Sequence, residues 1–137
     1  MASRARRRVR RDAPPRPDRV IQRRLVSAFL AASRAGDFTA LLAILHEDVV
    51  FRADVGGDQP AFTPVSGAEA VARHVLATAP RFARFTHPVL VNGVPGALAG
   101  TVTEPIAVIG FTVIGSRIHA IDIIADPNKL RALQKHI

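Results

Sequence analysis

The sequence IAVIGFTVIGSRIHAIDIIA, residues 106–125, carries the clearest structural pattern of the chain. Two apolar runs rich in β-branched residues, 106–114 and 117–125, lie on either side of Gly115-Ser116. Two such runs joined by two residues that begin with Gly are typical of a β-hairpin. The first run is apolar at successive positions, so we expect both of its faces to be covered and the strand to be central in a sheet.

Further strands are predicted on the N-terminal side of this hairpin. Residues 86–92 and 97–103 flank Gly93-Val94-Pro95-Gly96, and Pro-Gly favours a type II turn. Residues 48–54 alternate in polarity, with Val49, Phe51 and Ala53 on one face and Val50, Arg52 and Asp54 on the other. This strand is therefore predicted to place two charged side chains on one face of the sheet.

Helical patterns occupy the rest of the chain. Apolar residues recur at helical spacing within 19–35, after Asp18 as a candidate N-cap and before Gly36 as a left-handed C-terminal stop. Asp37 caps a second helix with an apolar stripe at Phe38, Leu41, Leu42 and Leu45. The two helices are joined so closely that they must form a corner or a hairpin.

Two more helix starts are visible downstream. Ser66-Gly67-Ala68-Glu69 has the spacing of a capping box and predicts a third helix, with Pro80 at its end. Pro127 begins a short terminal helix. The order helix, helix, strand, helix and then a run of antiparallel strands predicts an α+β domain, with the helices grouped on one face of a curved antiparallel sheet.

Composition limits the classes of function. The chain has 137 residues with 48% hydrophobic content and no Cys, so it suits a single domain without disulfides, thiolate nucleophiles or Cys-based metal sites. Residues 1–24 contain ten Arg and two Asp, which accounts for the net charge of +8, and the remainder is neutral. We expect 1–17 to be a disordered Arg/Pro-rich arm, capable of weak nonspecific nucleic-acid contact, and 18–137 to be the folded domain.

Three later segments resemble a known family. They are Val65-Ser66-Gly67-Ala68-Glu69-Ala70-Val71-Ala72-Arg73, Val91-Asn92-Gly93-Val94-Pro95-Gly96, and Asp126-Pro127-Asn128-Lys129-Leu130. In this order they resemble the SnoaL-like domain that forms the C-terminal extension of certain extracytoplasmic-function sigma factors. The resemblance covers about residues 20–133. It implies a nuclear-transport-factor-2-like cone, with three helices on the concave side of the sheet and a short C-terminal helix.

The chain departs from the family pattern in three places. The segment Asp54-Val55-Gly56-Gly57-Asp58 stands where the family often has Asp-Gly-Gly-Gly-Lys, and the terminal motif has Asp126 for Asn and Asn128 for Asp. The residues before position 18 are too few for the two DNA-binding domains of a sigma factor. We therefore expect a free-standing relative, a truncated product or an excised domain rather than a complete sigma factor.

Several polar residues are candidates for a pocket. Arg52 and Asp54 could meet Asn92 or Asp122 across the sheet, so these four are the predicted pocket-lining residues. An Asp among aliphatic residues can have a raised pKa, and related folds use such carboxylates as general bases. Asp122 and Asp54 are thus the catalytic candidates of an alternative interpretation. Against it, the sequence contains no Tyr to stabilise an oxyanion, and the five His show no metal-ligand spacing.

The terminal motif has both a structural and a functional interpretation. Asp126 can cap the helix that Pro127 begins, and Leu130 can pack against the sheet. Lys129 has no such structural task and is the best single candidate for a partner contact. The five residues 126–130 together are the predicted contact segment.

The resemblance implies a non-enzymatic regulatory domain that modulates transcription initiation through contacts with sigma-factor domains or RNA polymerase. The alternative is a small-pocket enzyme or ligand-binding protein of the SnoaL or ketosteroid-isomerase type. We expect no cofactor, no metal, no membrane contact and a cytoplasmic location, with a homodimer as a further arrangement to test.

Overall fold

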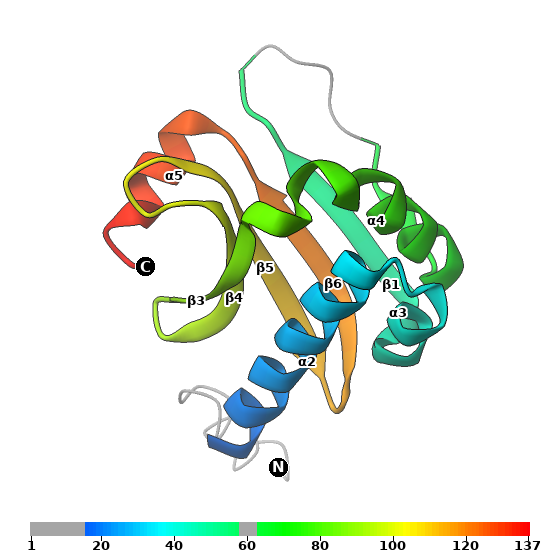
Figure 1. Ribbon diagram of the computed structural model, residues 1–137. Coiled ribbons are helices and arrows are strands. Elements are labelled where there is room, and N and C mark those ends of the chain that lie inside the picture. Colours follow the sequence, from blue (N-terminus) through cyan, green and yellow to red (C-terminus); the bar gives the residue numbers. More distant parts are fainter. Residues whose placement is uncertain (1–15, 58–62) are drawn as a thin grey trace, which may run out of the picture.

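The computed structural model describes residues 16–57 and 63–137 (Figure 1). The first helices and strand are α2 (Arg16–Ala35), α3 (Phe38–Ile44) and β1 (Leu45–Asp54). They are followed by β2 (Val65–Ser66), α4 (Ala68–Phe82) and the short 3-10 helix η1 (Ala83–Phe85). The remaining elements are β3 (Thr86–Val91), β4 (Val94–Gly100), β5 (Pro105–Ile114), β6 (Arg117–Ile124) and α5 (Pro127–Gln134). The predicted arm lies, apart from residues 16 and 17, outside the described residues.

The six strands form one curved sheet in the order β2-β1-β6-β5-β4-β3. Strands β5 and β6 are central, and for β5 this confirms the prediction made from the apolar run 106–114. Four of the neighbouring pairs are antiparallel, but β1 pairs with β6 in parallel. The expected antiparallel sheet is therefore a mixed one. The reason is the path of the chain, which leaves β1 through α4, builds the antiparallel run β3–β6, and returns beside β1 in the same direction.

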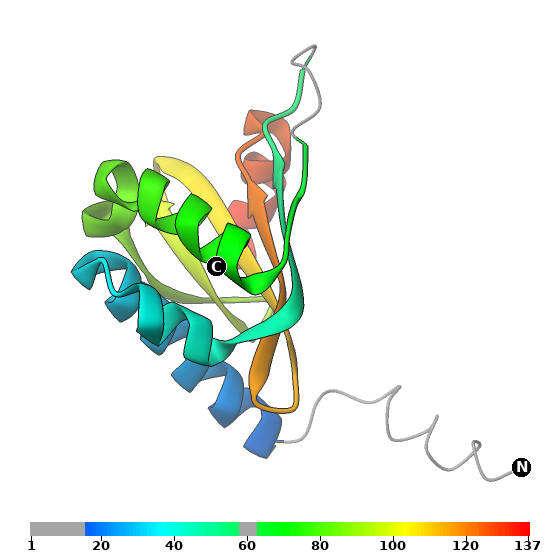
Figure 2. The same ribbon diagram turned by 90° about the vertical axis from the view of Figure 1, so that its right-hand side faces the viewer.

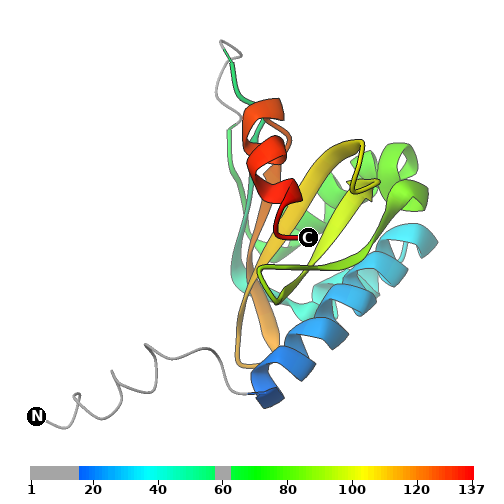
Figure 3. The same ribbon diagram turned by 90° about the vertical axis from the view of Figure 1, so that its left-hand side faces the viewer.

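Helices cover the two faces of the sheet unequally. Helices α2, α3 and α4 lie on the concave face, and α5 packs on the opposite face (Figures 1, 2 and 3). The main core lies under the three helices and includes Leu41, Val49 and Ile121, each fully buried. A smaller cluster under α5 is built from Leu98, Val108 and Leu130. The α+β class is confirmed, and so is the predicted arrangement of three helices on the concave side with a short C-terminal helix.

One hairpin turn differs from the prediction. The β3–β4 loop is Asn92-Gly93, with Val91 paired to Val94, so Pro95 and Gly96 belong to β4 rather than to a type II turn. Asn92 and Gly93 have φ of 53° and 78°, the left-handed values that a two-residue type I′ turn requires at both positions. Asn-Gly is the pair best suited to these angles, and it prevails over the nearby Pro-Gly.

Three helix-end predictions are wrong. Helix α2 begins at Arg16, so Asp18 lies in its first turn instead of capping it. Helix α4 begins after Gly67 without a side-chain cap, because Ser66 is part of the short strand β2. Pro80 lies inside α4, which continues to Phe82. By contrast, Asp37 caps α3 as expected, its carboxylate accepting a hydrogen bond from the Ala40 amide at 3.0 Å.

The helices of the described residues are too short or too polar to cross a membrane.

Candidate functional site

The segments 54–57 and 125–130, far apart in the sequence, meet at one end of the sheet. The Ala125 amide donates to the Asp54 carbonyl at 2.8 Å, which continues the β1–β6 pairing beyond the last strand residue. The Asp54 carboxylate accepts a hydrogen bond from the Gly56 amide at 3.0 Å and forms an ion pair with Lys129. We call these two segments the motif junction. At the motif junction, residues 54–57, which differ from the family pattern, contact the terminal motif at residues 126–130.

Gly56 allows the close approach at this junction. Its φ is +72°, and a Cβ there would lie 2.4 Å from Cγ of Asp126. Asp126 in turn caps α5, accepting a hydrogen bond from the Asn128 amide at 3.2 Å, and Pro127 occupies the first turn. Only glycine therefore fits between the β1 loop and the helix cap. The sequence marks Gly56 as a loop residue but does not show which residue it faces.

Lys129 is not left without a structural task, contrary to the prediction. Its ammonium pairs with Asp54, and the hydrogen bond from Lys129 is the main reason why the pKa of Asp54 is lowered. The same hydrogen bond raises the pKa of Lys129. A carboxyl group with a lowered pKa is a weaker proton acceptor, so this pairing does not favour Asp54 as a general base.

Arg52 and Asp122 are brought together as expected. They are direct neighbours in the β1–β6 register, and the guanidinium makes two hydrogen bonds to the carboxylate, at 2.7 and 3.0 Å. The hydrogen bond to Asp122 raises the pKa of Arg52. Both side chains project from the face opposite the main core, because Phe51 between Arg52 and Val50 points into that core. The pair is exposed on the outer face of the sheet.

Asn92 lies apart from the other three candidates. It occupies the β3–β4 turn, where its backbone amide donates to the backbone carbonyl of His136 at 2.9 Å. The four predicted pocket-lining residues therefore divide into an ion pair, a junction residue and a turn residue. None of them lines the two surface hollows described below.

The space between the helices and the sheet is filled with apolar side chains. Phe29 and Phe111 meet edge to face with ring centres 5.2 Å apart. Among the described residues, the buried polar side chains are Ser33 and Thr86, and each donates to a helix carbonyl at 2.7 Å. The half-buried His74 contacts Phe51 edge to face, with ring centres 4.7 Å apart. The concave side thus offers His74 as a partly buried titratable group, at its edge.

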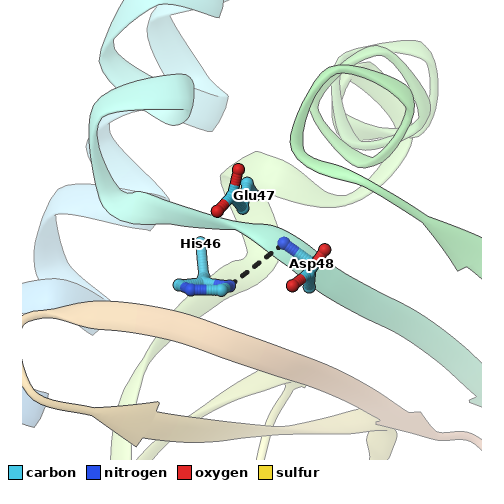
Figure 4. Close-up of side chains that lie close together, drawn as sticks. All are labelled: His46, Glu47 and Asp48. Atoms are coloured by element: carbon cyan, nitrogen blue, oxygen red, sulfur yellow. Dashed lines mark hydrogen bonds between the residues drawn. The ribbon is translucent and has the colours of Figure 1, made fainter.

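Three consecutive residues, His46, Glu47 and Asp48, bring potential ligand atoms within 4.8 Å of one another (Figure 4). Their register is irregular, since the β1–β6 pairing shifts between Leu45 and Val50. The shift lets His46 stack on His119, with ring centres 4.0 Å apart. Nδ1 of His46 already accepts a hydrogen bond from the Asp48 amide at 3.0 Å, and both carboxylates are exposed. The irregular register of β1 is sufficient to account for the proximity of the three side chains, and we assign no metal site to them.

The surface of the described residues includes two hollows. One, of about 380 Å³, lies between α5 and the start of β5 and includes Ala125, Pro127 and Leu130 of the motif junction in its lining. The other, of about 450 Å³, lies between the end of α2 and the end of α4. Leu130 is 5% exposed, so it forms the floor of the first hollow, as its predicted inward packing requires.

Comparison with known proteins identifies the family. The model of the SnoaL-like domain matches residues 26–128. This chain belongs to the SnoaL-like domain family. The match covers the second half of α2, the helices α3 and α4, the sheet and the first residues of α5, so the resemblance predicted from the three motifs is confirmed. No curated protein sequence matches the chain.

Solved structures of similar proteins confirm the nuclear-transport-factor-2-like fold. The chain is 28% identical to the Mycobacterium tuberculosis extracytoplasmic-function sigma factor SigJ, with a TM-score of 0.66 over 80% of this chain and 44% of that one. The chain thus spans less than half the length of that protein. An NTF2-like protein of Burkholderia xenovorans is 20% identical, with a TM-score of 0.50 over 83% and 95% of the two chains. An LEH-like epoxide hydrolase of M. tuberculosis is 19% identical, with a TM-score of 0.54 over 88% and 94%. The last two show the fold alone.

Proposed function

We propose that this SnoaL-like domain is a non-enzymatic regulatory domain, related to the C-terminal extension of extracytoplasmic-function sigma factors. It modulates transcription initiation through contacts with sigma-factor domains or RNA polymerase, and the motif junction carries the contact. The observation that supports this most directly is the meeting of residues 54–57 with 125–130, which gathers two family-related segments at one exposed edge.

The surroundings of the junction suit a protein contact. Pro127 and Leu130 line a surface hollow, and Ile106, which is 47% exposed, lies at its edge. Arg131 lines the same hollow and donates to the Asn128 side chain. A hollow whose lining combines apolar side chains with polar and cationic ones can form part of a small protein interface. Likeness to SigJ supplies the sigma-factor context of the proposal.

The enzymatic alternative rests on fewer features. Its two candidate bases, Asp54 and Asp122, are ion-paired and partly exposed on the outer side of the sheet rather than set in a closed apolar pocket. Likeness to an epoxide hydrolase at 19% identity concerns the fold, and a fold does not fix a reaction. His74 beside Phe51 is the described residue that best suits proton transfer inside the cone. Turnover of an epoxide or ketone that disappears in His74→Gln would support this alternative.

A matched pair of variants tests the proposed contact. The full chain is titrated with the promoter-binding domains of an extracytoplasmic-function sigma factor and, separately, with core RNA polymerase. Lys129→Ala and Asp54→Asn both break the same ion pair, but only Lys129→Ala removes the cation. If Lys129 contacts the partner, Lys129→Ala weakens binding and Asp54→Asn does not. Equal losses would attribute the effect to the shape of the junction, and unchanged binding in both variants would contradict the proposal.

A further inference from the structure

Two long stretches of the chain contain no acidic residue. Residues 19–36 and 70–103 lack Asp and Glu, but together they contain seven arginines: Arg19, Arg23, Arg24, Arg34, Arg73, Arg81 and Arg84. The acidic residues of the chain beyond Asp18 lie outside both stretches. A domain that is neutral beyond residue 24 is therefore unevenly charged along its length.

The fold places the two stretches side by side. Helix α2 runs along β3 and β4 (Figures 1 and 3), and three side chains of α2 donate to carbonyls of the second stretch. Arg34 donates to Thr86 at 2.7 Å, Arg19 to Gly93 at 2.9 Å, and Gln22 to Pro95 at 2.9 Å. One flank of the domain, formed by α2, the end of α4, η1 and β3, is consequently cationic.

A hollow of about 450 Å³ opens at one end of this flank. Its lining combines the apolar side chains of Leu76, Ala79, Pro80 and Ala83 with those of Arg34 and Arg84. The guanidinium carbon of Arg84 lies 5.5 Å from the ring centre of Phe85, and that ring is 46% exposed. Phe82, on the other side of Ala83 in the chain, is 41% exposed. Two exposed aromatic residues are thus direct chain neighbours of Ala83 and Arg84, which line the hollow.

The arginines at this edge are not neutralised by the domain itself. Within residues 16–57 and 63–137, the ion pairs join Arg52 to Asp122, Arg73 to Glu69, and Lys129 to Asp54. Arg81 and Arg84 take part in none of these pairs. Asp37 follows the hollow-lining Gly36 in the chain, but its carboxylate is engaged in capping α3.

We propose that this hollow is a docking site for an acidic amphipathic segment of a partner protein. Apolar side chains of the segment enter between α2 and α4, and its carboxylates pair with Arg84, Arg81 and Arg34. The charge of the flank selects an anionic partner, and the apolar floor beside Phe85 selects one that also carries apolar anchors. A nucleic-acid backbone would use the arginines but would leave that floor and ring without a complement. The site is separate from the motif junction, so it goes beyond the contact proposed above.

A peptide-binding experiment on the full chain tests the proposal. The probe is a fluorescein-labelled helical peptide with Leu at one face and Glu at the other, compared with a version in which every Glu is Gln. Arg84→Gln and Phe85→Ser should each weaken binding of the acidic peptide at least about tenfold, as expected for residues at an interface centre. The Gln peptide should bind poorly to the parent chain. Arg117→Gln and Ile114→Ser are the matched controls, since both residues are exposed at the β5–β6 hairpin.

Several results would overturn the proposal. If Arg84→Gln and Phe85→Ser bind the peptide as the parent does, the Arg-rich residues 1–24 account for binding. If single-stranded DNA of equal charge binds with the same sensitivity to both variants, the surface recognises nucleic acid. A concentration-dependent dimer that Phe85→Ser abolishes would assign the hollow to a second copy of the chain. Both variants should melt as the parent does. Arg84→Glu, which has the length of Arg84→Gln but reverses the charge, should weaken binding of the acidic peptide further.

Discussion

The motif junction and the cationic hollow present charged residues in opposite ways. At the junction, Lys129 forms an ion pair with Asp54. Asp126 caps α5, and Arg131 donates a hydrogen bond to the Asn128 side chain. At the hollow, Arg84 lies over the exposed Phe85 ring and takes part in none of the ion pairs of the described residues. The comparison teaches that a paired charge such as Lys129 contributes to the fold in addition to the partner contact proposed for it, whereas Arg84 has no such pairing. Substitutions at the junction should therefore reduce stability, whereas those at the hollow should not.

The largest loss of stability is expected from Leu130→Ala. Leu130 is 5% exposed and packs with Leu98 and Val108 beneath α5. Removing its buried methyl groups should lower the free energy of unfolding by about 2–4 kcal/mol, as measured by urea denaturation. Leu133→Ala, at a half-buried position of the same cluster, should lower it less. Equal losses in the two variants would show that burial does not distinguish the two positions.

Gly56→Ala should have the next largest effect, and Gly57→Ala is its control. Both glycines have left-handed φ, of +72° and +65°, so either substitution introduces backbone strain of about 1 kcal/mol. A Cβ at Gly56 also meets Asp126, whereas one at Gly57 meets nothing within 4 Å. Displacing the Asp126 cap adds about 1 kcal/mol to the loss at Gly56. If calorimetric melting shows the same shift for both variants, the close approach at the junction does not contribute to stability.

The smallest loss of stability is expected from Lys129→Met. The pH dependence of this loss shows whether it comes from the ion pair with Asp54. The pKa of Asp54 is lowered from 3.8, so the pair's contribution is present above that value and is lost as the pH falls through the lower folded pKa. The pKa of Lys129 is raised from 10.5, so the contribution is present below that value and is lost as the pH rises through the higher folded pKa. The melting temperature of the parent should therefore be slightly higher than that of the variant between about pH 5 and pH 9, and added salt should reduce this difference.

This comparison is made by thermal melts of both proteins across the pH range. Arg117→Gln removes one charge at an exposed site outside the described ion pairs and serves as the control. A difference between parent and Lys129→Met that persists unchanged at strongly acidic pH would contradict an electrostatic origin, because Asp54 is then neutral.

Local sequence patterns predicted most elements because such patterns depend on nearby residues. The alternation at Val49 and Phe51 placed both side chains in the core, and the helical spacing of Val71 and Val75 placed both against the sheet. The errors occurred where two local signals competed. The sequence prediction places the turn at Pro95-Gly96, whereas the structure places it at Asn92-Gly93. The prediction also assigns Ser66 to a helix cap, although Ser66 pairs with Val50 in the sheet.

The candidate site was predicted only in part. From the sequence, Asp122 or Asn92 is offered as a partner of Arg52 and Asp54 across the sheet, and the structure forms the Arg52–Asp122 contact. The pairing of Asp54 with Lys129, residues 75 positions apart, was not anticipated, since Lys129 was expected to face solvent without a partner. The cationic hollow was not anticipated either, although the absence of Asp and Glu from residues 19–36 and 70–103 was visible in the sequence.

The amino-acid sequence was thus sufficient for the order of the elements, their inward faces, the cap at Asp126 and the family. The elements, their inward faces and the cap follow from spacings of two to four residues, which set side-chain direction in strands and helices. The family follows from the resemblance of the three longer motifs. Tertiary structure alone placed β1 parallel to β6, brought Gly56 against Asp126, and set α2 beside β3 and β4. Such contacts depend on sheet register and chain path, and a shift of one residue would turn each strand side chain to the other face.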